Sequence, residues 1–245
     1  MNPEDESEAA TGSKQERARS RLALALDVAS AGEATALARR LRPHFSVVKV
    51  GLELFVAEGP DVVRALTGEG FDVFLDLKLH DIPNTVGRAA ARAGGLGVRY
   101  LTVHLAGGEQ MVRAAVEGFA SASPGAPGSG ILGVTVLTSE PEAGDEVLAE
   151  RARLAASAGC VGAVCASADL PVVRPAATRL VLVVPGIRME GSDRGDQARI
   201  ATPGSALASG ADLLVIGRTV TAAADPEAAA ALVSASLLGG SWQQH

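Results

Sequence analysis

The chain has 245 residues, enough for one large α/β domain with a sizeable core or for two small domains. Hydrophobic residues make up 47% and aromatic residues only 3%, so leucine, valine, isoleucine and alanine must build the core. The formal net charge of −6 argues against a general binder of nucleic acids or anionic membranes, although a local basic pocket is compatible with it.

Residues 1–20 are polar and charged and contain no apolar stretch typical of a secretory signal. We predict a disordered or flexible tail there. No later apolar run reaches the ~20 residues of a membrane span. Cys160 and Cys165 do not form a C-x-x-C motif and are expected to be free thiols in a reducing compartment. These features indicate a cytoplasmic protein without membrane or nucleic-acid partners.

Residues 21–245 are predicted to form a single domain in which short apolar runs alternate with alanine-rich stretches of helical spacing. This alternation predicts parallel strands covered by helices, and eight repeats indicate a (β/α)₈ TIM barrel. A doubly wound open sheet is the alternative, but D-V-A-S-A-G-E follows the first run instead of a G-x-G-x-x-G turn. The eight runs are 22–28, 46–51, 72–78, 99–105, 131–137, 162–166, 179–185 and 212–217.

Charged residues stand near the C-terminal ends of the first three predicted strands. Because side chains alternate across a strand, Asp27 shares a face with small residues, and Lys49 shares one with Val47. Asp76 and Lys78 share a face of the third strand in the same way. Three strands thus direct charge towards the barrel axis where barrel enzymes place catalytic groups. The alternative is a structural salt-bridge cluster, but burying unpaired charge is costly.

These aspartates, with Asp81 just beyond the third strand, alternate with the lysines and favour their charged form. Charged lysines donate protons and bind anions, whereas a Schiff-base lysine needs a depressed pKa, so an aldolase is disfavoured. We see no cluster of His, Cys and carboxylates with convincing ligand spacing, and expect neither a metal nor another cofactor.

The segment 183–205 is long, polar and glycine-rich, and it follows the seventh predicted strand. Loops after strands seven and eight form the common phosphate site of this fold. Arg188, Gln197 and Arg218 are the candidate donors, with the backbone of Gly217 close to the phosphate. Thr202, followed by a proline, is predicted to cap a helix that starts after this loop.

The stretch D-L-K-L-H-D-I-P-N-T (76–85) resembles the D-x-K-x-x-D-I-x-x-T signature of the orotidine 5′-phosphate decarboxylase family. L-A-L-D-V, V-K-V-G, L-T-V-H, G-V-T-V-L-T-S, P-G-I-R, G-D-Q-A-R and V-I-G-R occur in the family's order between residues 22 and 220, and the bacterial-type subgroup is the nearest match. The resemblance implies conversion of orotidine 5′-phosphate to UMP in de novo pyrimidine biosynthesis. It also implies a homodimer with shared active sites and no cofactor.

The resemblance further implies a role for each matching residue. Lys78 would protonate C6 of the substrate, Asp76 would lie against its carboxylate, and Asp27 and Lys49 would bind the ribose hydroxyls. The remaining matches are Asp81, Ile82 and Thr85, reaching a neighbour's site across the dimer interface, Thr138 at the pyrimidine, and Arg188, Gln197, Gly217 and Arg218 at the phosphate. The chain departs from the family at Thr219, where a proline is common, and at Met189 and Glu190 in a variable part of the lid.

Two alternatives remain open at this point. D-x-K-x-x-D also occurs in related barrels, which leaves a keto-sugar phosphate decarboxylase using a metal-bound enediolate. A non-catalytic nucleotide-binding protein is the other. His80 is expected in the loop at the barrel mouth, and His104 is interpreted as a hydrogen-bonded structural histidine.

Overall fold

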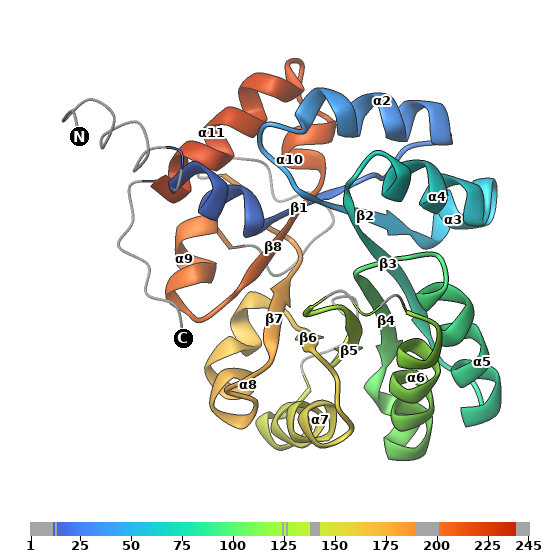
Figure 1. Cartoon of the computed structure of the whole chain (residues 1–245). Helices are drawn as coiled ribbons and strands as arrows, with labels where there is room; N and C mark the ends of the chain where they lie inside the picture. The colour runs from blue at the N-terminus through green and yellow to red at the C-terminus, as the bar shows by residue number, and fades with distance from the viewer. Residues whose placement is uncertain are drawn as a thin grey trace, which may run out of the picture.

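The computed structural model describes residues 12, 14–123, 125, 127–137, 143–189 and 201–238. Eight parallel strands pair in chain order, and the eighth pairs with the first to close a barrel surrounded by helices (Figure 1). The predicted (β/α)₈ barrel is confirmed, and the alternative open sheet is wrong because β1 pairs with both β2 and β8.

Each predicted apolar run overlaps one strand of the barrel, and most strands are shorter than the run; β3 ends one residue after its run, and β5 begins one residue before its run. The strands are β1 Leu22–Ala25, β2 Val47–Gly51, β3 Asp72–Leu79, β4 Tyr100–His104, β5 Gly130–Val134, β6 Gly162–Val164, β7 Val181–Val184 and β8 Leu213–Ile216.

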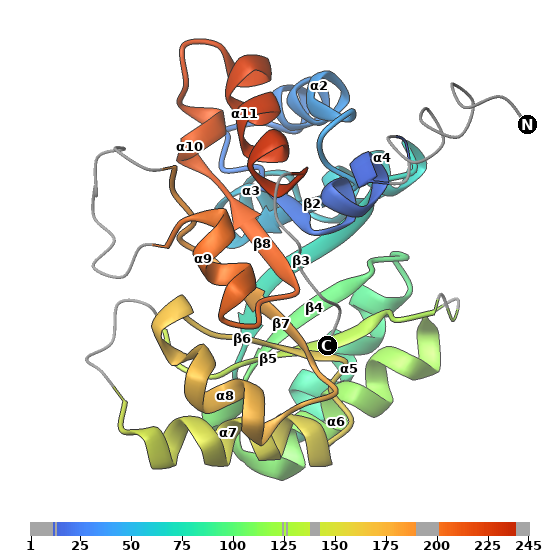
Figure 2. The ribbon, with the colours of Figure 1, turned by 90° about the vertical axis from the view of Figure 1, so that its left-hand side faces the viewer.

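The helices lie on the outside of the barrel, and α11 closes the ring by packing against α2 and α9 (Figure 2). Thr202 caps α9 as predicted, because its side chain accepts a hydrogen bond from the Ser205 amide. The helices are α2 Ala31–Leu41, α3 Leu52–Glu58, α4 Pro60–Gly68, α5 Pro83–Gly94, α6 Gly108–Ala122, α7 Asp145–Ser157, α8 Leu170–Ala176, α9 Pro203–Ala208, α10 Arg218–Thr221 and α11 Pro226–Leu238, with 3₁₀ turns η1 Leu105–Gly107 and η2 Ser167–Asp169.

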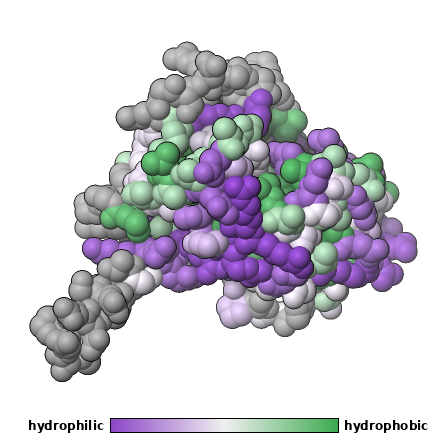
Figure 3. Space-filling view, turned by 90° about the horizontal axis from the view of Figure 1, so that it is seen from above, coloured by the Kyte–Doolittle hydropathy of each residue, from purple (hydrophilic) through white to green (hydrophobic). Residues whose placement is uncertain are grey.

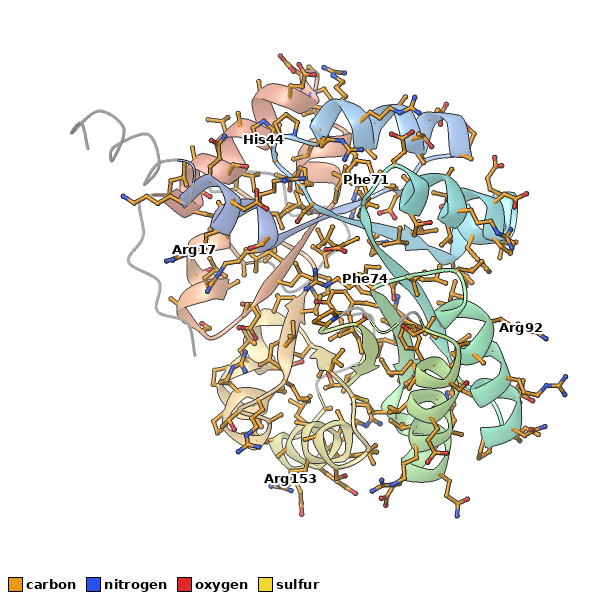
Figure 4. The ribbon with its side chains drawn as sticks, in the orientation of Figure 1. Arg17, His44, Phe71, Phe74, Arg92 and Arg153 are labelled. Carbon is orange, nitrogen blue, oxygen red and sulfur yellow. The ribbon has the colours of Figure 1, made fainter. Side chains whose placement is uncertain are left out.

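The strands bury side chains on both faces, in two separate cores. The larger core lies between the strands and the helices and includes Leu22, Leu24 and Leu26 of the first apolar run. The smaller core fills the barrel, and Phe74 lies at its centre, whereas Arg92 and Arg153 project from the outer helices (Figure 4). The interior residues are Ala23, Ala25, Val47, Phe74, Tyr100, Leu132, Val183, Leu213 and Val215. The predicted inward and outward faces of the first strand are therefore confirmed.

Helices α5 and α6 approach each other closely because glycines face one another. A Cβ atom built on Gly118 would lie only 2.1 Å from the carbonyl oxygen of Gly87, and one on Gly94 would lie 2.6 Å from the carbonyl oxygen of Phe119. Real Cβ atoms do not approach backbone this closely, so any side chain at Gly118 would push the helices apart.

The described segment before β1 contacts the barrel. Residues 14–20 are mostly helical, Ala18 is buried in the larger core, and Arg19 Nε donates a hydrogen bond of 3.0 Å to the Arg42 carbonyl. This apolar contact and this hydrogen bond attach residues 14–20 to the barrel. Residues 1–11 and 13 lie outside the described part of the chain.

Hydrophilic side chains form a broad band on the face that carries α2 and α11 (Figure 3). Arg40 of α2 pairs there with Glu227 of α11 at 3.0 Å. No described helix has the length and apolar character that a membrane crossing requires. Cys160 and Cys165 are free, as predicted, and burial raises the pKa of each thiol to about 12.

Candidate active site

The C-terminal end of β3 is irregular, and the irregularity places two of the predicted catalytic residues. Leu75 pairs with Leu101 of β4, but the next pairing joins Leu79 to Val103, so residues 76–78 oppose the single residue 102. Such a bulge bends the strand and redirects its side chains. Lys78 has a φ angle of +50°, which among the described residues makes it the single non-glycine with a positive φ.

Hydrogen bonds hold this strained backbone in place. The Lys78 amide donates to Thr102 Oγ1 at 2.8 Å, and this hydroxyl donates in turn to Asp76 Oδ1 at 2.9 Å. Lys78 Nζ donates to the other carboxylate oxygen, Asp76 Oδ2, at 2.7 Å. Both ends of Lys78 are therefore linked to Asp76, directly through the ammonium group and indirectly through a fully buried threonine.

A second lysine–aspartate pair stands beside the first. Lys49, near the end of β2, donates to Asp27 Oδ1 at 3.1 Å, and its side chain is only 12% exposed. Gly51 leaves room for the ammonium group, because a Cβ atom at that position would lie 3.1 Å from Lys49 Nζ. Asp27 follows β1, Lys49 is in β2, and Asp76 and Lys78 are in β3, in agreement with the predicted strands. These three successive strands therefore place two negative and two positive side chains at one end of the barrel.

These charges line a cavity of about 420 Å³, a volume suited to a small-molecule ligand. The loops after β7 and β8 bring Arg188, Gly217 and Arg218 to the same cavity. Arg188 is 8% exposed, and its amide donates to the Ala201 carbonyl at 2.9 Å. The cavity thus has a cationic end beside its lysine–aspartate pairs.

A second cavity, of about 590 Å³, adjoins the first and shares the four charged residues and Glu53 with it. It extends to His80 and His104, whose rings are stacked with their centroids 5.4 Å apart. His80 is exposed in the loop after β3, as expected, and His104 is buried. Glu53 was not predicted as a site residue, and its position in the first turn of α3 offered no distinguishing pattern.

Three residues predicted at the site do not line either cavity of their own chain. Asp81, Ile82 and Thr85 are exposed after β3, and Asp81 Oδ1 accepts a hydrogen bond of 2.6 Å from the Ile82 amide. Thr138, Gln197 and Glu190 lie outside the described residues.

Thr102 is the most informative residue that the sequence analysis did not identify. It lies in L-T-V-H at an inward position of β4 and is fully buried. A polar residue on the inward face of a strand next to the Asp76–Lys78 strand was the signal that could have identified it. Within the described ranges, no three His, Cys, Asp or Glu side chains converge in a way that could hold a metal ion.

The site defines a class of protein: a (β/α)₈ barrel with a lysine–aspartate cluster at its mouth and a cationic end for an anionic ligand. Comparison with known families gives the particular one. A family model described as "Orotidine 5'-phosphate decarboxylase / HUMPS family" matches residues 20–233, and the chain belongs to this family.

Relatives and solved structures agree with this membership. A protein of Anaeromyxobacter sp. (strain K), named orotidine 5′-phosphate decarboxylase, is 46% identical over 228 residues, which cover 89% of this chain and 98% of the relative. One of the same name from Thermobifida fusca is 47% identical, with 88% and 95% covered. The crystal structure of orotidine 5′-phosphate decarboxylase from Lactobacillus acidophilus superposes with a TM-score of 0.76 at 32% identity, covering 89% of this chain and 99% of that one.

Proposed function

We propose that the chain decarboxylates orotidine 5′-phosphate to UMP in de novo pyrimidine biosynthesis. The observation that carries the proposal is a single cavity that joins the Lys78–Asp76 pair to the two arginines after β7 and β8. Curated relatives that share almost half of the sequence carry the name of this enzyme.

The chemical groups of this substrate correspond to the groups along the cavity. Its phosphate suits Arg188, Arg218 and the backbone of Gly217, because arginine binds phosphate through charge-assisted hydrogen bonds. Its ribose hydroxyls suit Asp27 and Lys49. Asp27 is near the phosphate end, since a Cβ atom on Gly217 would lie 3.9 Å from Asp27 Oδ2.

The remaining part of the substrate, the pyrimidine ring with its carboxylate, would then lie against Asp76 and Lys78. In the same proposal Thr138 contacts the pyrimidine, and Gln197 completes the phosphate site. These two assignments depend on the resemblance of their motifs to those of the family.

Lys78 carries the chemistry in this proposal. The bond between C6 and the carboxylate carbon breaks, CO₂ leaves, and the electron pair stays on C6 in the plane of the ring. The Lys78 ammonium group stabilises that charge and transfers a proton to C6, and the neutral lysine then takes a proton from solvent. Asp76 holds the ammonium group at 2.7 Å and faces the substrate carboxylate.

Repulsion between Asp76 and the substrate carboxylate cannot account for catalysis by itself. Two like charges ~4 Å apart repel by about 4 kcal/mol at an effective dielectric of 20. Enzymes that accelerate very slow reactions lower the barrier by up to ~20 kcal/mol. Preorganised stabilisation by Lys78 and binding energy from the phosphate must therefore contribute most of the difference.

We further propose that the protein is a homodimer with shared active sites and that it works in the cytoplasm. Asp81, Ile82 and Thr85 are exposed away from their own cavity, so they are available to a partner subunit. Large apolar side chains are also exposed, at Leu52 and Val56 on α3 and at Ile82 before α5. Burial of such side chains favours association. Two free, buried thiols are consistent with a reducing compartment.

Subunit complementation tests the shared site. Lys78→Ala and Asp81→Ala should each be nearly inactive as homodimers. In a mixed dimer one site carries both changes, whereas the other takes Lys78 from one chain and Asp81 from the other and is intact. Random exchange makes about half of the dimers mixed, so about a quarter of the sites should recover activity. No recovery, with exchange confirmed by mass labels, would place both residues in the site of one chain.

The activity itself is tested by adding the folded protein to orotidine 5′-phosphate and following the loss of substrate absorbance, with UMP identified as the product. A folded protein that binds the substrate but does not turn it over would overturn the proposal in favour of a nucleotide-binding role. Activity should persist after exhaustive dialysis against EDTA. Loss of activity that Mg²⁺ restores would instead favour the keto-sugar phosphate alternative.

A further inference from the structure

Thr219 joins the two phosphate-side loops of the barrel. It follows Arg218 in α10, after β8, and its hydroxyl donates a hydrogen bond of 3.0 Å to the carbonyl oxygen of Ile187, after β7. The same carbonyl accepts a hydrogen bond of 3.2 Å from Arg188 Nη1, which also lies 3.5 Å from Thr219 Oγ1. Three polar atoms from two loops therefore form a closed triangle around one edge of the Arg188 guanidinium group.

The direction of the hydrogen bonds gives the Thr219 hydroxyl a specific role. A hydroxyl has one proton and two lone pairs, and the proton is used by the Ile187 carbonyl. The oxygen therefore presents lone pairs to Arg188, whose guanidinium group can only donate. The contact at 3.5 Å is long by itself, but the shared carbonyl fixes both donors relative to each other.

The hydrogen bond also connects the segment that carries Arg188 to the helix that carries Arg218. Arg188 and Arg218 line the same cavity from different loops, and Thr219 is the sequence neighbour of Arg218. A planar guanidinium group binds phosphate well only when its orientation is fixed, because its donors form a rigid fork. A shift of the loop after β7 would turn Arg188 away from the phosphate that Arg218 binds.

We propose that Thr219 is a positioning residue that aligns Arg188 with Arg218 for the phosphate group of the substrate. The proposal rests on the proposed function for the identity of the substrate, but the phosphate site can be tested without turnover.

The test compares Thr219→Val, which removes the hydroxyl and keeps the shape, with Thr219→Ser, which keeps the hydroxyl. Thr221→Val is the matched control, because Thr221 lies in the same short helix and its hydroxyl makes no hydrogen bond to a described residue. The affinity for inorganic phosphate is measured by ³¹P NMR titration, and kcat and KM are measured with orotidine 5′-phosphate.

Thr219→Val should weaken phosphate binding and raise KM about tenfold, a change equivalent to ~1.4 kcal/mol, with kcat changed much less. Thr219→Ser should restore both values, and Thr221→Val should behave as the unaltered protein. In an Arg188→Ala background, Thr219→Val should add less than about twofold, because two residues that act through one contact are not additive.

The proposal would be overturned if Thr219→Val left the phosphate affinity unchanged. It would also be overturned if Thr219→Val still raised KM by the full tenfold in the Arg188→Ala background. If Arg188→Ala does not fold, the phosphate titration and the rescue by serine decide the matter. If the unaltered protein fails to turn over orotidine 5′-phosphate but Thr219→Val still weakens phosphate binding, the proposed function fails and the role of Thr219 stands.

Discussion

Replacing Thr102 by valine tests whether the bulge in β3 holds Lys78, the proposed proton donor, in position. The change keeps the shape of the side chain and removes only the hydroxyl. That hydroxyl accepts the Lys78 amide proton at 2.8 Å and donates to Asp76 at 2.9 Å. Valine would leave the amide without this acceptor and the carboxylate without this donor.

The structure gives the expected size of both effects. A hydrogen bond to a charged group contributes about 1.5–3 kcal/mol, and a buried donor left unsatisfied costs about 1–3 kcal/mol. Because Lys78 is partly exposed, water can satisfy some of the lost contacts, and we expect the free energy of unfolding to fall by about 2–4 kcal/mol. The φ of +50° at Lys78 would also relax, and a 1 Å displacement of the ammonium group would lower kcat about 100-fold.

Urea unfolding followed by circular dichroism measures the stability, and turnover of orotidine 5′-phosphate measures kcat. Thr102→Ser is the control, because it keeps the hydroxyl and loses only a methyl group, so kcat should stay near its original value despite some loss of stability. A folded Thr102→Val protein with an unchanged kcat would show that the hydroxyl does not position Lys78.

Lys78→Ala should abolish turnover and leave the circular dichroism spectrum of a folded protein, and more than a few per cent of residual activity would exclude it as the proton donor. Arg218→Ala should raise KM strongly for orotidine 5′-phosphate and have little effect on orotidine, and equal losses on both would remove it from the phosphate site. Gly118→Ala should lower the melting temperature, because its Cβ would lie 2.1 Å from a backbone oxygen, whereas Gly68→Ala, with nothing within 4 Å, should leave it unchanged or raise it. Burial lowers the pKa of His44 from its ordinary 6.5, although the negative charge of Glu227 acts in the opposite direction. The unfolded chain therefore binds the proton more tightly than the folded protein, and the free energy of unfolding should fall as the pH drops below about 6.5. His44→Gln should reduce this pH dependence, measured by urea titrations at pH 7.5 and 5.5.

The barrel could be predicted from the sequence because its strands are buried on both faces. Strands of this kind appear as nearly continuous apolar runs, and the alanine-rich stretches between them have helical spacing. The inward direction of Asp27 and Lys49 followed from simple alternation, since β1 and β2 pair in regular register. Regular geometry was therefore sufficient to predict that Asp27 and Lys49 lie at the same end of the barrel.

Asp76 and Lys78 both line the cavity, but simple alternation along the strand does not fully account for their geometry. Residues 76–78 form a bulge, and Lys78 adopts a backbone conformation that lysine rarely occupies. No glycine marks this position, so nothing local in the sequence indicated the bulge. The Lys78 amide in the bulge donates to Thr102, a residue 24 positions away that becomes a neighbour only when β3 and β4 pair.

The function of the residues after β3 could not be predicted from the geometry of a single chain. Asp76 and Asp81 belong to one continuous motif, yet the bulge directs Asp76 into the cavity, whereas the loop leaves Asp81 exposed. Only four residues therefore separate a carboxylate that lines the cavity of its own chain from one that does not. If Asp81 completes a partner's site, as proposed, the motif contains the catalytic group of one active site and a contribution to another. Dimer formation would then explain why Asp81 and Ile82 are adjacent in this motif. The contact that places Asp81 at the partner's site would also bury the apolar side chain of Ile82, which is exposed in the single chain.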